Sequence, residues 1–165
     1  MTAGLFIGRF QPFHNGHLSA VKQILEQNDK IIIGIGSSQY KHTKDNPFTA
    51  EERKEMIQKT LDDEGIKDYE IIFTPDIHND EKWAAHVESL CPNFNIVYTN
   101  SEHTRKCFEI LNKYPIKGIE KEFDISSTEI RKRIKEGEDW DELVPETIFN
   151  EILRIDGINR IKSLK

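Results

Sequence analysis

One short stretch near the start of the chain, residues 5–18, constrains the fold more than any other part of the sequence. An apolar run ends at Gly8, and a turn that contains Pro12 and Gly16 follows it. From residue 17 the apolar side chains recur at helical spacing. The pattern predicts a strand, a tight loop and a helix. The start of such a helix presents free backbone N–H groups and the positive end of the helix dipole, which favour a bound phosphate.

The next apolar run, residues 30–35, is almost continuous and rich in isoleucine. Such a run is typical of a central parallel strand that is covered on both faces. Further strands are expected at residues 70–74 and 95–99, with a weaker, charged edge strand at 117–123, and helices at residues 50–63, 81–90, 101–112 and 145–157. The alternation predicts an α/β fold, a Rossmann-like doubly wound parallel sheet with C-terminal helices.

Two helix starts carry the spacing of a capping box. Thr49 precedes Glu52 by three positions, and Ser126 precedes Glu129 in the same way. Arg131 lies one turn into the second of these helices, close enough to face a ligand at the helix start. A polar segment at residues 39–46 is expected to form a mobile loop.

Length and charge narrow the class of protein. At 165 residues and 36% apolar composition the chain fits a single domain, with a core at about residues 1–136 and a C-terminal helical segment at about 137–165. The formal net charge of −6 argues against broad electrostatic binding of nucleic acid. No apolar run approaches the length of a membrane-spanning helix, and the N-terminus lacks a signal-peptide pattern, so we expect a cytoplasmic protein that does not bind a membrane.

The cysteines and histidines give no regular metal-binding pattern. Cys91 and Cys107 stand apart without a C-x-x-C spacing, and we expect them to be buried or idle thiols. No metal ligand is predicted. The alternative is a metal site like that of a hydrolase, with ligands drawn from His14, His17, His42 and His78. It is disfavoured because a turn, and not a helical spacing, separates the first two histidines.

The expected ligand site lies at the carboxyl ends of the strands. In a parallel α/β sheet, ligands bind outside these ends, at the switch point of the strand order. The loops expected there are residues 9–17, 37–46, 76–80 and 99–101, and the turn at 126–131 closes the same side. Two helix starts, two histidines and two arginines would then surround one crevice, which suits a polyphosphate. No Walker A sequence occurs, so a P-loop kinase is disfavoured.

Three motifs carry a resemblance to a known family. Residues 8–17, Gly-Arg-Phe-Gln-Pro-Phe-His-Asn-Gly-His, resemble the H-x-G-H signature of the nucleotidyltransferase superfamily, which also includes class I aminoacyl-tRNA synthetases. Residues 125–131 are similar to the second motif of that superfamily, I-S-S-T-x-x-R. With N-P-F-T-x-x-E-R at residues 46–53, the first motif resembles the archaeal-type nicotinamide-nucleotide adenylyltransferases. Late segments at 137–140 and 144–146 extend the resemblance over nearly the whole chain.

The resemblance implies a reaction and an ATP site. ATP and nicotinamide mononucleotide (NMN) would give NAD and pyrophosphate, with Mg²⁺ held mainly by the ATP phosphates. The residues that act on the phosphates would be His14, His17 and Arg131. The full set of implied ATP contacts is Gly8, Arg9, Phe10, His14, Gly16, His17, Ser126, Ser127, Thr128 and Arg131. Because the attacking phosphate oxygen is already anionic, alignment and charge stabilisation are sufficient for in-line transfer without a covalent intermediate.

The resemblance also implies an NMN site. Asp76 and Ile77 would lie near the nicotinamide amide, and Trp83 would stack on the cationic ring. The full set of expected NMN contacts is Lys41, Lys44, Asp76, Ile77, Trp83 and Asn100. The two lysines are candidates for the NMN phosphate, because Asp45 stands where some archaeal members carry an arginine. A homo-oligomer, such as the hexamer that the archaeal-type family tends to form, is implied by the resemblance alone.

Three other readings compete with this one. Phosphopantetheine adenylyltransferase shares the two motifs, although its first motif usually reads G-x-F-D-P where this chain has G-R-F-Q-P. A nucleotide-binding module without catalysis is a second alternative. A tRNA-charging enzyme is disfavoured, because the chain has no room for an anticodon domain.

Overall fold

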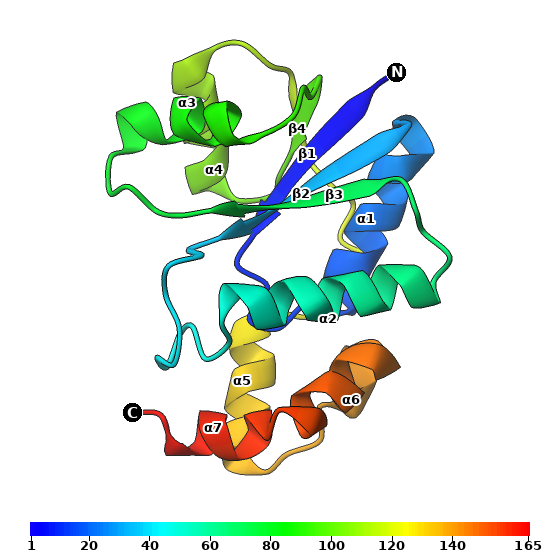
Figure 1. The fold of residues 1–165 in the computed structure, drawn as a ribbon, viewed down its shortest axis with the longest axis vertical. Helices are drawn as coiled ribbons and strands as arrows, with labels where there is room; N and C mark the ends of the chain where they lie inside the picture. Colours follow the sequence, from blue (N-terminus) through cyan, green and yellow to red (C-terminus); the bar gives the residue numbers. More distant parts are fainter.

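The computed structural model describes residues 1–165 and shows a parallel sheet with helices on both faces (Figure 1). The strands are β1 (Ala3–Gly8), β2 (Lys30–Gly36), β3 (Tyr69–Thr74), β4 (Ile96–Tyr98) and β5 (Ile116–Lys117). Their order in the sheet is β3-β2-β1-β4-β5, and every paired strand is parallel to its neighbour. The predicted doubly wound parallel sheet is confirmed.

The helices form two groups. Those that follow the first four strands are α1 (Asn15–Gln27), α2 (Ala50–Asp63), α3 (Asp80–Leu90) and α4 (Glu102–Leu111). The C-terminal part contributes α5 (Ser127–Glu136), a 3₁₀ turn at Asp141–Leu143, α6 (Glu146–Arg154) and α7 (Gly157–Ser163). Figure 1 shows α3 and α4 on one side of the sheet, and α1 and α2 on the other, with α5, α6 and α7 beyond α2.

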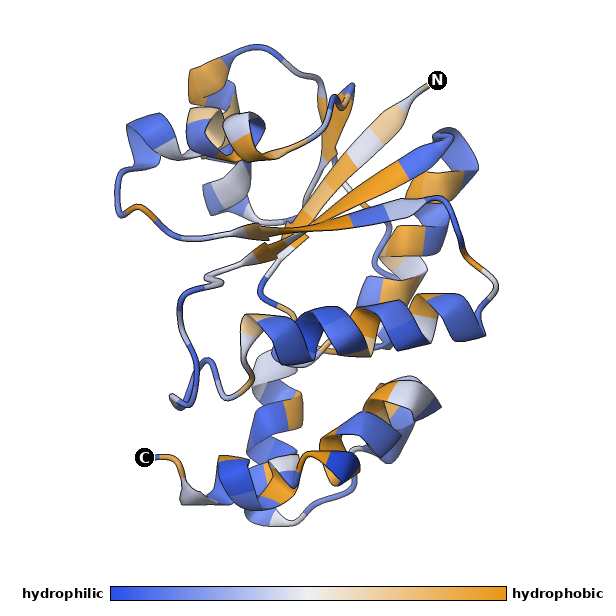
Figure 2. Cartoon of the chain, in the orientation of Figure 1, coloured by the Kyte–Doolittle hydropathy of each residue, from blue (hydrophilic) through white to orange (hydrophobic).

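The side chains of β2 alternate between two hydrophobic clusters. Ile31, Ile33 and Ile35 pack with the apolar residues of α1 and α2, whereas Ile32 packs with those of α3 and α4. All four side chains are fully buried, and each such burial contributes about 1.5–3 kcal/mol. Apolar residues therefore gather along the central strands (Figure 2). The prediction that residues 30–35 form a central strand covered on both faces is confirmed.

The order of the strands reverses at β1. The chain runs outward from β1 through β2 to β3, and then returns to place β4 on the other side of β1. The loops that follow β1 and β4 thus separate at the carboxyl end of β1, where ligands bind in sheets of this class.

The C-terminal helices share the core of the sheet. Ile148, Ile152 and Ile161 belong to the same hydrophobic cluster as Phe48 and the β2 isoleucines that face α1 and α2. An ion pair adds to this packing, because the Arg160 guanidinium donates to both carboxylate oxygens of Glu52, at 2.6 and 3.0 Å. The predicted division of the chain near residue 137, into a core and a C-terminal helical segment, stays a prediction.

The charged strand predicted at residues 117–123 is wrong beyond its first residue. Only Ile116–Lys117 pairs with β4, and the chain then continues without regular structure. Side chains take the place of a neighbouring strand there. Asn100 donates to the Ile119 carbonyl and accepts from the Ile119 N–H, both at 2.8 Å, and Gln23 bonds the backbone of Glu120 in the same way. Satisfied backbone groups remove the need for a sheet partner.

The helix predicted at residues 145–157 is also corrected. The structure contains two helices, α6 and α7, separated at Asp156, whose φ of 57° is left-handed. Gly157 follows in close contact, since an added Cβ would lie 2.9 Å from the Ile152 side chain. The chain therefore turns sharply and packs α7 against α5.

None of the helices combines the length and hydropathy that a membrane-spanning segment needs.

We expect the pair of Glu52 and Arg160 to contribute measurably to stability. The predicted capping box is confirmed, because Glu52 accepts from the Thr49 N–H at 2.9 Å while Thr49 accepts from the Glu52 N–H at 3.0 Å. Both side chains of the ion pair are largely buried. Arg160→Met should therefore lower the free energy of unfolding by about 1.5–3 kcal/mol, measured by urea denaturation.

Lys106→Met is the matched control. It removes a cation from an exposed pair with Glu102 at 4.0 Å, where a change below about 0.5 kcal/mol is expected. Equal effects of the two substitutions would contradict the role given to Arg160.

Candidate functional site

The loop after β1 ends in a helix cap built by two histidines. The Nδ1 atom of His14 accepts from the Gly16 N–H at 3.0 Å, and the Nδ1 atom of His17 accepts from the His14 N–H at 3.0 Å. Helix α1 therefore begins at Asn15, earlier than the sequence pattern predicts, because His14 is its N-cap. An Nδ1 that accepts carries no proton, so each neutral imidazole keeps its N–H at Nε2. Both histidines present a donor.

Gly16 is required by this cap. A Cβ at that position would lie 2.8 Å from the Cε1 atom of the His14 ring. The glycine of the H-x-G-H sequence thus leaves room for the imidazole that closes the first turn of α1.

Burial keeps both imidazoles neutral. The pKa of His14 is lowered to about 4, mainly by burial and secondarily by the charge of Lys121. His17 packs among the rings of Phe10, Phe13 and His14, with centroids 4.8, 5.3 and 3.7 Å away. Desolvation by burial is the main cause that lowers the pKa of His17 well below its usual value, and the neighbouring His14 is the second cause. The site therefore offers neutral donors.

The second motif is bound to the same loop. The Ser127 hydroxyl donates to the Pro12 carbonyl at 2.8 Å, and Nη1 of Arg131 donates to the Gln11 carbonyl at 2.9 Å. Ser126 caps α5 by accepting from the Glu129 N–H at 3.1 Å. The reciprocal half of the predicted capping box is absent, because the Glu129 carboxylate pairs with Arg133 instead.

The starts of α1 and α5 consequently border one cleft of about 370 Å³. His14, Gly16 and His17 line it from one helix, and Ser126 and Ser127 from the other. These two motifs, whose pattern predicts a shared crevice, lie together in the structure.

The third motif holds the loop from the opposite side. Gln11 exchanges two hydrogen bonds with the backbone of Phe48, at 3.1 and 3.0 Å. The fully buried Arg53 donates to the carbonyls of Arg9 and Gly36 at 2.8 Å, and to those of Ser37 and Thr49 at 3.3 and 3.2 Å. Arg53 thereby joins the ends of β1 and β2 to the start of α2. Sequence reasoning gave Arg53 no role, although an arginine on the buried face of a helix was a signal for one.

Positive charge accumulates around this loop. Arg9 is exposed, whereas Arg53 and Arg131 are buried, and the charge of Arg9 acts on both of them. Burial, and then the charge of Arg9, lower the pKa of Arg53 to about 10 and lower that of Arg131. The carboxylate nearest to Arg131 is that of Asp45, which is exposed and 3.9 Å away. Such under-compensated charge favours a polyanion.

A second, larger cleft of about 570 Å³ lies beside the first loop. Gly8, Arg9, Asp76, Ile77 and Trp83 line it, so three of the expected NMN contacts share one cavity with Arg9. The loop that carries Asp76 is tied to the end of β2. Ser37 donates to its carboxylate at 2.7 Å, and Gln39 bonds its backbone N–H and carbonyl at 3.0 and 2.8 Å.

Strained backbone marks the same loops. Phe10, Ser37 and His78 follow β1, β2 and β3, and have left-handed φ values of 54°, 50° and 54°. Each costs of the order of 1–3 kcal/mol, and such strain collects where a loop must take one conformation.

Several predicted contacts, Thr128 and Arg131 among them, lie elsewhere than expected. Phe10 is 2% exposed and packs beneath His17 instead of lining a cleft. Asn100 borders the cleft of the histidines, with both atoms of its amide bonded to Ile119. Lys44 lines a third cleft, of about 430 Å³, with Thr128 and Arg131, and Lys41 is exposed on its loop and lines none of these cavities.

Comparison with known proteins agrees with this geometry. Residues 5–133 match the cytidylyltransferase-like family. The nicotinamide-nucleotide adenylyltransferase of Thermoplasma acidophilum is 48% identical over 162 residues, which cover 96% of this chain and 89% of that protein. The protein of the same name from Pyrococcus furiosus is 43% identical over 168 residues, covering 99% and 89%. The chain belongs to the nicotinamide-nucleotide adenylyltransferases.

A solved structure of the family supports the fold. The crystal structure of a bifunctional NMN adenylyltransferase/ADP ribose pyrophosphatase from Francisella tularensis, complexed with AMP and a manganese ion, superposes with a TM-score of 0.81 at 26% identity. The match covers 98% of this chain and 52% of that one. This family member thus spans about half the length of the bifunctional protein.

The depressed pKa of His14 predicts a dependence of stability on pH. Between about pH 6.5 and 4 the unfolded chain binds a proton at this residue that the folded chain does not, so the free energy of unfolding falls as the pH is lowered. For His14 alone the loss between about pH 7.5 and 5 is about 2 kcal/mol. His14→Asn keeps a cap acceptor and removes the titration, so urea denaturation should show a smaller loss.

His42→Asn, on an exposed loop, is the control and should lose as much stability as the wild type. If His14→Asn also behaved like the wild type, His14 would not be held neutral by the cap.

Proposed function

We propose that the loop after β1 and the start of α5 bind the triphosphate of ATP, and that the chain transfers the adenylyl group to NMN, giving NAD and pyrophosphate. One observation carries the assignment of the residues. Two helix starts and two imidazoles with free Nε2–H donors border one cleft at the switch point of the sheet, and the buried Arg131, which lines the third cleft, donates to the Gln11 carbonyl of the same loop.

We call His14, His17, the start of α5 and Arg131 the phosphate clamp, and it acts by stabilising charge. As pyrophosphate leaves, negative charge grows on the β and γ phosphates. The Nε2–H groups of His14 and His17 and the N-terminus of α5 are fixed donors that need no reorganisation when this happens. Arg131 adds a full charge and is held by the Gln11 carbonyl. Asp45, whose exposed carboxylate lies 3.9 Å from the guanidinium, is a weak competitor for it.

The larger cleft is the proposed site of NMN. The phosphate oxygen of NMN is anionic and attacks the α phosphorus of ATP directly, so no general base is needed and the protein supplies alignment. Trp83 is half-buried with its ring edge-to-face to Phe108 at 5.8 Å, which fixes the indole for stacking on the pyridinium. Arg9 lies in the same cleft and is the cation best placed between the two nucleotides.

The clamp suits Mg²⁺ that arrives with ATP. His14, His17, Ser126 and Ser127 offer N–H and O–H donors at the histidine cleft, which suit phosphate oxygens and not a cation, and the carboxylates of its lining, Glu120 and Glu122, belong to the segment after β5. We therefore propose that ATP phosphates and water hold the Mg²⁺, which would neutralise part of the phosphate charge. A homo-oligomer, a cytoplasmic location and the roles of Lys41 and Lys44 stay predictions.

The function is tested by the reaction itself. Purified protein with ATP, Mg²⁺ and NMN should form NAD and pyrophosphate in equal amounts. Chromatography measures the NAD, and a coupled enzymatic assay measures the pyrophosphate. Phosphopantetheine offered at the same concentration should react far more slowly. A preference for phosphopantetheine would favour a phosphopantetheine adenylyltransferase. Binding of ATP without turnover would favour a nucleotide-binding module without catalysis.

Substitution of His17 tests the clamp. His17→Ala removes one fixed donor and should lower turnover by about 100-fold or more. His17→Gln keeps an acceptor for the His14 N–H, as glutamine does in a capping box, and should fold like the wild type while still losing rate. His42→Ala, on the exposed loop, should keep full activity. Near-normal turnover in both His17 variants would contradict the phosphate-binding role.

A further inference from the structure

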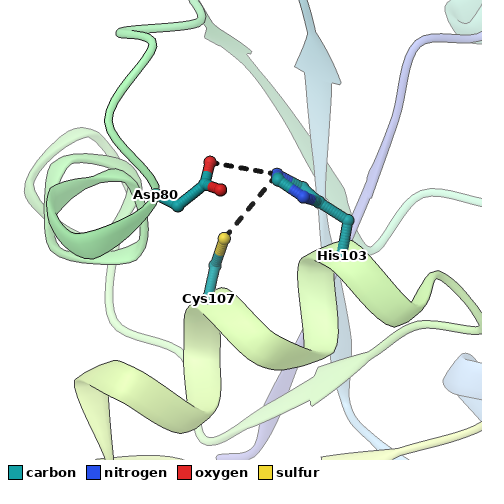
Figure 3. Close-up of side chains that lie close together, drawn as sticks. All are labelled: Asp80, His103 and Cys107. Carbon is teal, nitrogen blue, oxygen red and sulfur yellow. Dashed lines mark hydrogen bonds and ion pairs between the residues drawn. The ribbon is translucent and has the colours of Figure 1, made fainter.

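Three side chains of different chemistry converge where α3 meets α4. The Nε2 atom of His103 lies 3.4 Å from a carboxylate oxygen of Asp80 and 3.8 Å from the sulfur of Cys107. All three ligand atoms lie within 4.8 Å of one another. Figure 3 shows the three side chains pointing toward one another, with Asp80 at the start of α3 and the other two on α4.

The spacing arises from the two helices. His103 and Cys107 are four residues apart on α4, so they lie on the same face, one turn from each other. Asp80 is the first residue of α3, which packs against α4. No local sequence pattern predicts this cluster, because Asp80 is distant in the chain from the other two residues and Cys107 has no partner cysteine.

These distances resemble those between the ligands of a tetrahedral zinc ion. With bonds of about 2.0–2.1 Å to nitrogen and oxygen and about 2.3 Å to sulfur, tetrahedral geometry separates nitrogen from oxygen by about 3.4 Å and nitrogen from sulfur by about 3.6 Å. The separations from His103 therefore need little change. The Asp80 side chain is 69% exposed and is free to adjust.

We propose that Asp80, His103 and Cys107 form a binding site for a zinc-class divalent cation, with one coordination position left open. A nitrogen, an oxygen and a sulfur ligand suit Zn²⁺ and Co²⁺, whereas Mg²⁺ takes oxygen ligands. The site is thus distinct from the Mg²⁺ proposed on the ATP phosphates. Asp80 and His103 are exposed, which gives a cation access from solvent, while the buried Cys107 anchors it from below.

The proposed cation site lies in the wall of the larger cleft, where NMN is proposed to bind. Asp80 and His103 belong to the lining of the 570 Å³ cleft, together with Ile77 and Trp83. A cation held by both helices joins α3, which carries Trp83, to α4. Bound Zn²⁺ therefore stiffens one wall of that cleft, and the open coordination position lies at its edge.

The test uses Co²⁺ as a spectroscopic probe of the full chain without nucleotide, so it does not depend on the proposed activity. Wild type should bind one Co²⁺ per chain, with visible ligand-field bands of tetrahedral intensity and a near-ultraviolet band from thiolate-to-metal charge transfer. Zn²⁺ should displace the Co²⁺, abolish both bands and raise the midpoint of thermal unfolding.

Variants assign the ligands. His103→Gln and Asp80→Asn change exposed side chains and should fold normally, yet weaken Co²⁺ binding at least 10-fold. Cys107→Ser should remove the charge-transfer band. His78→Gln, which changes another histidine of the same cleft, and Cys91→Ser are the controls and should bind like the wild type.

Two results would overturn the proposal. One is a wild-type spectrum without the charge-transfer band, because the thiolate would then not be a ligand. The other is binding that His103→Gln and Asp80→Asn leave unchanged, because the cation would then lie elsewhere.

Discussion

The buried guanidinium of Arg53 is the interaction on which the rest of the site depends. It donates to carbonyl oxygens of Arg9, Gly36, Ser37 and Thr49, and these come from the ends of two strands and the start of a helix. Burying a charge costs several kcal/mol, and it lowers the pKa of Arg53 to about 10. Hydrogen bonds of a charged donor to four carbonyls offset that cost. The arginine stays protonated at neutral pH and fixes the path of the loop after β1.

Once that loop is fixed, its own carbonyls hold the second motif. The carbonyls of Gln11 and Pro12 accept from Arg131 and Ser127, at 2.9 and 2.8 Å. The same loop then turns into the histidine cap of α1. Three segments distant in sequence therefore meet through main-chain acceptors. The motif side chains at the histidine cleft, those of His14, His17, Ser126 and Ser127, can then donate to a ligand, which is what a polyphosphate requires.

Neutral and charged donors divide the work in this site. Arg9 and Arg131 supply the long-range attraction for an anion in a chain of net charge −6. The imidazoles of His14 and His17 supply direction, because the helix cap fixes their tautomer and stacking holds their rings 3.7 Å apart. Neutral histidines also avoid adding further repulsion to a cluster in which the charge of Arg9 already contributes to the lowered pKa of Arg53 and of Arg131.

Local pattern was sufficient to predict much of this architecture. The isoleucine run of β2 and the motifs at residues 8–17 and 125–131 predicted the central strand and the two helix starts at one crevice. The errors come from long-range contacts. Residues 118–123 do not form a strand, and Asn100 and Gln23 satisfy the backbone of Ile119 and Glu120 there. The role of Arg53 and the cluster around His103 depend on which segments pack together, and α7 depends on the close contact of Gly157 with Ile152.

The most direct test of the account is a crystal structure with a non-hydrolysable ATP analogue and NMN bound together. The account predicts phosphates between the starts of α1 and α5, within hydrogen-bond distance of Nε2 of His14 and His17 and of the Arg131 guanidinium, with the pyridine ring against Trp83. Phosphates held instead beside Lys132 and Lys135, out of hydrogen-bond reach of both histidines, would contradict it.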